Sequence, residues 1–167
     1  MQVAPIPDNE AERLAALYEL LILDTPPEER YDKIVRFAAA EFDVPIVLFT
    51  LLDANRQWFK ASVGTEVCET DRDASFCSHV ILSDAIMVVP DALQDPRFAD
   101  NPLVTGEPHI RFYAGAPLTL RSGVRLGTLC LIDRQPRTLD ALDLGILGTL
   151  RDLVVMELTH ASEAADA

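Results

Sequence analysis

The stretch RFYAGAPLTLRSGVRLGTLCLID, residues 111–133, predicts two β-strands folded back on each other. Mainly apolar residues run from 112 to 120 and from 124 to 132, and Gly123 can adopt the positive φ that a turn between them requires. Because both faces of this hairpin are largely apolar, we expect it in the middle of a sheet covered on both sides. Gly115 and Pro117 interrupt the pattern, and since proline cannot donate a backbone hydrogen bond, we expect a bulge or a strand edge there.

Side chains alternate between the two faces of a strand, which divides the first strand of the hairpin into two sets. One face carries Phe112, Ala114, Ala116, Leu118 and Leu120. The other carries Tyr113, Gly115, Pro117 and Thr119. Bulges often lie beside functional sites, so this strand is a place to expect a pocket.

The length and composition of the chain indicate one acidic domain. A chain of 167 residues is long enough for a single substantial core. Its net charge of −13 argues against nucleic acid and against an anionic membrane as partners. No segment approaches transmembrane length, the N-terminus lacks a signal-peptide pattern, and an odd count of three cysteines fits a reducing compartment. We therefore expect a cytoplasmic protein.

Two helices and two strands are predicted before the hairpin, after a flexible N-terminus at residues 1–8. A capping box at Asn9 and Glu12 begins a helix over residues 10–23. Thr25, followed by two prolines, caps a second helix whose apolar stripe is Tyr31, Ile34, Val35, Ala38 and Phe42. Residues 46–52 are apolar enough for a central strand, and the alternating residues 57–63 predict a strand nearer an edge.

The region between the second strand and the hairpin predicts only short elements. Residues 65–74 are polar and predict a surface loop, 75–82 a short helix, 86–89 a short strand, and 95–98 a single helical turn. A last helix begins at Thr138, and the small, acidic tail at residues 161–167 is expected to be flexible. Residues 9–160 thus form one α+β domain with an antiparallel sheet.

Five strings of the sequence resemble the GAF domain family, and together they span nearly the whole chain. They are LDTPPEERYD at 23–32, VPIVLFTLLDANRQWFKASVG at 44–64, SFCSHVI at 75–81, VVPDALQDPRFADNPLV at 88–104, and IRFYAGAPL with LGTLCLIDRQPR at 110–118 and 126–137. They are similar to those of bacterial sensor-type GAF domains.

The resemblance implies a PAS-like fold whose central antiparallel sheet has five or six strands, the five main ones in the order 2-1-5-4-3. It places the first, second and last helices on one face, and loops and short helices over a small-molecule pocket on the other. Such domains are non-enzymatic sensors in signal transduction, and they usually precede histidine kinases, diguanylate cyclases or phosphodiesterases. The implied partners are therefore an unidentified small ligand and an output domain, in the native chain or in trans. No cofactor is named by the sequence.

The string Cys77-Ser78-His79 has the most reactive composition. It is compatible with a cofactor thioether, a pair of metal ligands or a redox thiol. We favour a simpler interpretation, in which Cys77 packs inward as a small apolar residue and His79 lines or rims the pocket. Tetrapyrrole-binding GAF relatives place Cys and His side by side, whereas Ser78 intervenes here.

An alternative function is reduction of free methionine sulfoxide, because Cys68 and Cys77 resemble two of the three cysteines of such GAF enzymes. The third cysteine of those enzymes would fall at residues 108–111, which read Pro-His-Ile-Arg. Without the attacking thiol this chemistry fails. A purely structural dimerisation module is a further alternative.

Metal and phosphate sites have little support. His79, His109 and His160 are scattered, no CxxC or HxxxH spacing occurs, and no glycine-rich phosphate loop is present. The residue set associated with cyclic-nucleotide GAF domains is also missing.

We predict that the ligand lies between the sheet and residues 65–110, since small-molecule sites are mostly apolar with a few polar groups. The predicted lining is Trp58, Phe76, Cys77, His79, Phe98, Arg111, Phe112 and Tyr113. Arg111 could hold a carboxylate bidentately or form a structural ion pair with an aspartate.

The last helix carries a long apolar stripe whose spacing is close to a coiled-coil seam. This stripe predicts a homodimer with the interface residues Leu142, Ile146, Leu150 and Leu153.

Overall fold

The computed structural model describes the backbone of residues 1–166 and the side chains of residues 1–160. The flexibility predicted for residues 161–167 therefore lies outside the described side chains. In chain order the elements are α1 (Glu10–Glu19), α2 (Glu29–Phe42), β1 (Ile46–Leu52), β2 (Arg56–Val63), β3 (Glu69–Asp71), α3 (Cys77–Val80), β4 (Met87–Val89), the 3₁₀ turn η1 (Ala92–Gln94), α4 (Pro102–Thr105), β5 (Phe112–Thr119), β6 (Arg125–Asp133) and α5 (Ala141–Asp166).

Six antiparallel strands form one sheet in the order β3-β2-β1-β6-β5-β4. The α+β class is therefore confirmed, and the order equals the expected 2-1-5-4-3 with β3 added at one edge. The β5–β6 hairpin lies inside the sheet as predicted, and its register shifts between Pro117 and Thr119, where proline interrupts the ladder.

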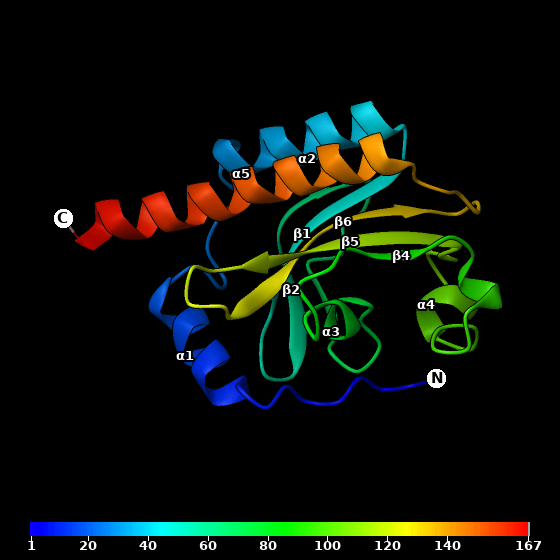
Figure 1. Ribbon diagram of the computed structural model, residues 1–167, viewed down its shortest axis with the longest axis horizontal. Coiled ribbons are helices and arrows are strands. Elements are labelled where there is room, and N and C mark those ends of the chain that lie inside the picture. Colours follow the sequence, from blue (N-terminus) through cyan, green and yellow to red (C-terminus); the bar gives the residue numbers. More distant parts are fainter. Residues whose placement is uncertain (167) are drawn as a thin grey trace.

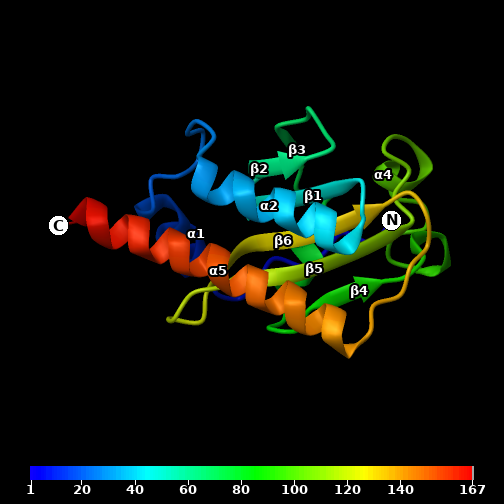
Figure 2. The ribbon, with the colours of Figure 1, turned by 90° about the horizontal axis from the view of Figure 1, so that it is seen from above.

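One face of the sheet is covered by α2 and α5, which lie side by side across it (Figures 1 and 2). The predicted stripe of α2 is buried there, together with Phe49 and Leu51 of β1. Alternation sends Phe112, Ala114, Ala116 and Leu118 of β5 into this same core. This face therefore holds the main hydrophobic core.

Short elements cover the opposite face of the sheet: α3, η1 and α4 lie below it in Figure 1. A smaller apolar cluster fills this side, with Ile46, Leu48, Tyr113, Cys130 and Ile132 from the sheet and Phe76, Phe98 and Val104 from the cover. Residues 1–8 have no regular structure and run along this side, where the Gln2 amide donates to the Arg97 carbonyl at 3.3 Å. No helix among the described residues has the length and apolarity needed to cross a bilayer.

The first helix departs from the expected arrangement. Instead of joining α2 and α5 as a layer, α1 lies at the end of the sheet, apart from these two helices in Figure 1. Leu17 packs into the main core from there, and the buried Arg13 donates to the Leu52 carbonyl at the end of β1. That long-range hydrogen bond ties α1 to the strand end rather than to the face of the sheet.

A helix cap, a helix start and a strand are among the other differences from the expectation. The first helix begins at Glu10 as predicted, but the Asn9 side chain makes no cap hydrogen bond. The second helix begins at Glu29 rather than at Pro26, since Thr25 accepts a hydrogen bond from the buried Lys60 ammonium at 2.7 Å. The predicted loop at residues 65–74 contains β3, which pairs with β2 despite its polar sequence.

Candidate functional site

A cavity of about 420 Å³ lies between the sheet and the segments that cover its second face. Its floor consists of side chains from β1, β5 and β6, namely Ile46, Leu48, Tyr113, Cys130 and Ile132. Its walls come from Phe59 of β2, from Phe76 next to α3, and from residues 103–110 around α4. This volume and this mostly apolar lining are typical of small-molecule sites.

Two of the eight predicted ligand residues, Phe76 and Tyr113, line this cavity. Their rings contact each other at a centroid distance of 4.9 Å, and Phe76 also stacks on Phe98 at 4.0 Å. Phe98 is thereby placed behind Phe76, where it supports the wall without facing the cavity.

The prediction that Trp58 and Phe112 line the cavity is wrong, because both side chains belong to the core under α2 and α5. Phe112 and Tyr113 are neighbours on one strand and must face opposite sides of the sheet, so they cannot share a pocket. Trp58 lies in β2, and the register between β1 and β2 shifts at Phe49/Thr50 of β1. Trp58 packs on the helix side of the sheet, and the next residue, Phe59, lines the cavity instead.

Cys77, His79 and Arg111 also lie outside the cavity lining. Cys77 is buried with Leu52 and Ile81 and accepts a hydrogen bond from the Thr50 hydroxyl at 3.3 Å. The His79 ring meets Phe98 edge-on at 5.0 Å. Arg111 donates to the Val104 and Ile110 carbonyls, so it holds backbone rather than a carboxylate.

The interior of the cavity is uncharged. The three charged residues that line it, Glu66, Glu107 and Arg134, are all solvent-exposed and therefore mark its mouth. The polar groups farther in are neutral: Gln57, Thr70 and Tyr113. The hydroxyls of Thr70 and Tyr113 are buried without a hydrogen-bond partner among the described residues. Because buried polar groups are normally paired, the Thr70 hydroxyl marks the cavity as a place for a ligand. The Tyr113 hydroxyl lies against Gly115, which is not part of the lining.

Replacing Tyr113 with phenylalanine is expected to leave stability unchanged or raise it by about 1 kcal/mol, because the lost hydroxyl is buried and unpaired. The ring itself stays fixed by Phe76 and by Gly115, where a Cβ would lie 2.6 Å from the Tyr113 hydroxyl oxygen. Urea denaturation of both proteins measures the difference. A loss above 1 kcal/mol would show that this hydroxyl is needed for folding.

Two of the three thiols, Cys77 and Cys130, are poorly placed for nucleophilic chemistry because they are buried. Burial raises the pKa of the Cys77 thiol, and it raises the pKa of Cys130 to about 12. The thiolate is the reactive species, so burial disfavours the reactive form of both groups. Cys68 is exposed and all three cysteines are free. Among the described residues no group of three or more His, Cys, Asp or Glu side chains could hold a metal ion.

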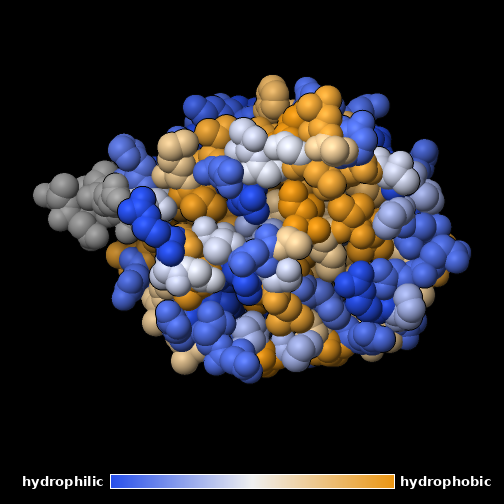
Figure 3. Space-filling view, viewed as in Figure 1, coloured by the Kyte–Doolittle hydropathy of each residue, from blue (hydrophilic) through white to orange (hydrophobic). Residues whose placement is uncertain are grey.

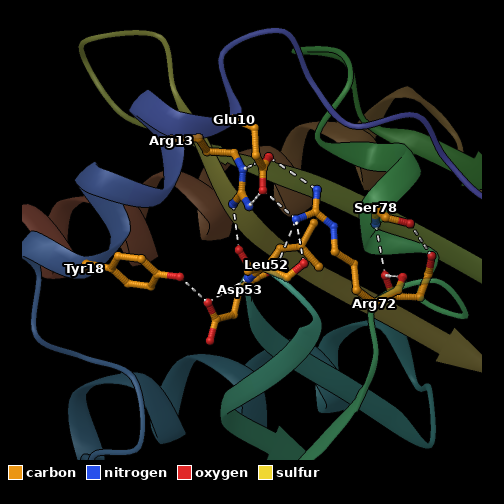
Figure 4. Close-up of polar contacts among 9 residues, drawn as sticks. Glu10, Arg13, Tyr18, Leu52, Asp53, Arg72 and Ser78 are labelled. Carbon is orange, nitrogen blue, oxygen red and sulfur yellow. Dashed lines mark hydrogen bonds and ion pairs between the residues drawn. The ribbon is translucent and has the colours of Figure 1, made fainter.

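A cluster of three charges ties α1 to the segment that covers the cavity (Figure 4). The Glu10 carboxylate accepts from Arg13 at 2.8 Å and from Arg72 at 2.6 Å, and Arg72 also donates to the Asp53 carbonyl at 3.1 Å. Both arginines are buried. Burial opposes the charge on Glu10, but the two arginines outweigh it and lower its pKa to about 2. Arg72 directly follows β3, which carries Thr70 of the cavity wall.

The four predicted interface residues of α5 have different environments. Leu142 is 72% exposed and Leu153 is 39% exposed, whereas Ile146 is half-buried and Leu150 is buried in the main core. The prediction that Leu150 lies at a dimer interface is therefore wrong. With 3.6 residues per helical turn, Leu150 faces the sheet on the same side as Leu147 and Val154. Figure 3 shows apolar side chains gathered over the first part of α5 and the adjoining β4 edge.

Sequence reasoning missed Gln57, Phe59 and Thr70. Phe59 directly follows Trp58 in the sequence, so alternation puts it on the opposite face, and following that alternation to the pocket side would have identified it. Thr70 had no such signal, because it lies in a polar stretch whose pairing with Gln57 only the fold reveals.

Comparison with known proteins agrees with this fold. The sequence profile of the GAF domain family matches residues 26–158. A cyclic di-GMP phosphodiesterase of Pseudomonas aeruginosa is 47% identical over 137 residues, which are 82% of this chain but 23% of that protein. The chain therefore spans less than a quarter of the length of this relative.

Two solved structures show the same fold at low sequence identity. The GAF domain of an Acinetobacter phosphoenolpyruvate-protein phosphotransferase superposes with a TM-score of 0.65 at 20% identity, covering 93% of this chain and 98% of that one. Free methionine-R-sulfoxide reductase of Neisseria meningitidis superposes with a TM-score of 0.63 at 17% identity, covering 99% and 98%. With the family profile spanning most of the residues, the conclusion is that this chain belongs to the GAF domain family.

Proposed function

We propose that this domain is a non-enzymatic sensor that binds a small molecule in the cavity and transmits its occupancy through the terminal helices to an output domain. The observation that carries the proposal is a mostly apolar cavity whose lining includes the buried, unpaired hydroxyl of Thr70. A sensory or regulatory role agrees with membership of the GAF family. The buried, high-pKa thiols support a role without covalent chemistry.

The output domain is proposed from the relative in Pseudomonas aeruginosa, a cyclic di-GMP phosphodiesterase in which the matching region is 23% of the protein. By analogy, the output domain would be a phosphodiesterase, cyclase or kinase that is either part of the same native chain or a separate protein bound in trans. We place the domain in the cytoplasm, since free thiols suit a reducing compartment.

Native mass spectrometry of protein purified from its own host tests the proposal. We expect a co-purified molecule that is lost when Leu103→Trp fills the cavity from α4. Leu93→Trp is the matched control, because Leu93 is 46% exposed and lies outside the lining. Circular dichroism checks that both variants fold. If neither the native protein nor added candidate metabolites give a bound species that Leu103→Trp removes, the sensor proposal fails.

Reduction of free methionine sulfoxide remains the second candidate, since the Neisseria meningitidis reductase shares the fold. Turnover with a thiol regenerating system, abolished by Cys77→Ser, would favour it. The burial of Cys77 and its raised pKa predict no turnover.

We further propose that the domain is a homodimer with α5 at the interface, as the exposed apolar residues Leu142, Leu153 and Met156 indicate. The double variant Leu142→Glu with Leu153→Glu is expected to be a folded monomer in sedimentation, because two carboxylates would be desolvated at the interface. Leu82→Glu with Leu93→Glu is the control, since these leucines are similarly exposed on other elements. A dimer in both variants would place the interface elsewhere, and a native monomer would contradict dimerisation itself.

A further inference from the structure

We propose that the ligand is an uncharged, flat ring compound bearing an adjacent hydrogen-bond donor and acceptor, as in a lactam or cyclic amide, and that Gln57 and Thr70 bind this edge. The inference rests on the proposed function, because it assigns a chemical class to the ligand of the same cavity.

The ligand is expected to be uncharged because of where the charged residues of the cavity lie. All charged residues of the lining are exposed at the mouth, and the floor and walls are apolar or neutral. A ligand charge carried into this interior would lose its hydration without gaining a partner, which is strongly unfavourable. A charged substituent is therefore accommodated only at the mouth, near Arg134, Glu66 or Glu107.

The donor and acceptor edge follows from one cross-strand pair. Gln57 of β2 and Thr70 of β3 are register partners in the antiparallel ladder, so their side chains lie next to each other on the cavity face. Gln57 is 6% exposed, and its side chain lines the cavity. The neighbouring Thr70 hydroxyl is buried without a hydrogen-bond partner among the described residues.

An amide presents a donor and an acceptor side by side, and a hydroxyl can act as either. Two such groups together match a ligand edge that offers both functions at neighbouring atoms, the geometry by which Gln reads an adenine edge in nucleic acids. A carboxylate ligand would lose its hydration in an interior that has no charged partner for it. A hydrocarbon would leave the Thr70 hydroxyl buried and unpaired.

The flat shape follows from the aromatic walls. Phe59 and Phe76 both line the cavity, and Phe76 is held in place by its stack on Phe98. Aromatic side chains pack well against other planar π systems, face to face with an offset or edge to face. The floor of Ile46, Leu48 and Ile132 adds apolar area without polar competition.

Binding of four named probes tests this class by chemical-shift perturbation in ¹H–¹⁵N spectra. The probes are 2-quinolone, its N-methyl derivative without the donor, naphthalene without either function, and the anion quinoline-2-carboxylate. We expect 2-quinolone to bind best and its N-methyl derivative about ten-fold weaker, the value of one net hydrogen bond. Naphthalene, which lacks both functions, and the anion, which loses its hydration, should bind more weakly still. Gln57→Leu should abolish the preference over the N-methyl derivative, whereas Gln94→Leu, an exposed glutamine of η1, should not.

The outcomes separate the two proposals. If the anion or naphthalene binds as well as 2-quinolone, or if Gln57→Leu leaves the preference intact, the ligand class is wrong while the cavity remains a binding site. If no probe perturbs residues of the cavity and native mass spectrometry shows no bound species, the sensor function fails and the ligand class with it.

Discussion

Replacing Glu10 with alanine is expected to lower the free energy of unfolding by about 3 kcal/mol, at the lower end of the range for breaking a buried ion pair. Among the described residues, the Glu10 carboxylate is the only negative charge that contacts Arg13 and Arg72, whose side chains are 1% and 6% exposed. Without it, two buried guanidinium groups face each other with backbone carbonyls as their remaining partners. Glu12→Ala is the matched control, because Glu12 is exposed in the same helical turn.

Urea denaturation followed by circular dichroism measures both variants. Hydrogen exchange then shows where the loss is felt, and we expect faster exchange both in α1 and at residues 65–75, because Arg72 joins them. A stability loss no larger than that of Glu12→Ala would show that the cluster contributes nothing net, as for many surface ion pairs.

Acid provides an independent test of the same cluster. The folded pKa of Glu10 is about 2, below its ordinary value of 4.5, so the folded state favours the ionised carboxylate. The stabilisation is therefore fully present above about pH 4.5 and is lost as the pH falls toward 2. Glu10→Gln should remove this part of the pH dependence, while Glu12→Gln should retain it.

The Glu10 cluster also shows where sequence reasoning ends. Local periodicity predicts the first helix but cannot reveal that Arg13 is buried. Arg13 donates to the Leu52 carbonyl, 39 residues away in sequence, and shares the Glu10 carboxylate with Arg72, which is 62 residues from Glu10. A buried arginine is unusual and depends on such partners. The position of α1 at the end of the sheet follows from these long-range bonds.

The central strands, in contrast, were predictable from local pattern. Residues 46–52 form a fully buried strand and residues 112–133 form the hairpin, with the bulge beside Pro117. Strand β3 was not predictable, since its three residues are polar and gain their structure only from β2. The cavity lies where the sequence predicts it, but most of its lining differs from the prediction. Aromatic character alone does not show which face of a strand a side chain takes, whereas alternation along the strand does.

Gly127 illustrates a second kind of limit. The sequence placed it in a strand as one small residue among apolar ones, and nothing local distinguishes it from an alanine position. In the fold, a Cβ at Gly127 would lie 1.9 Å from the Thr50 carbonyl oxygen and 2.8 Å from its carbonyl carbon. These are backbone atoms of β1, the strand paired with β6 in the middle of the sheet. They cannot turn aside as a flexible side chain would.

Gly127→Ala is therefore expected to cost about 4 kcal/mol, among the largest effects of a single substitution. Relief would require separation of β1 from β6 next to the buried pair Thr50 and Thr128, whose hydroxyls lie 2.9 Å apart. Since domains of this size are stable by only about 5–15 kcal/mol, the variant should be close to unfolding at 37 °C.

Gly145→Ala is the matched control for this substitution. Gly145 lies in α5 with open space where a Cβ would be, so alanine should raise stability by about 1 kcal/mol through its higher helix propensity. Urea denaturation of both variants gives the two free energies with opposite signs. A cost below 1 kcal/mol for Gly127→Ala would show that β1 and β6 can move apart at their centre. The floor of the cavity, which these strands supply, would then be compliant rather than rigid.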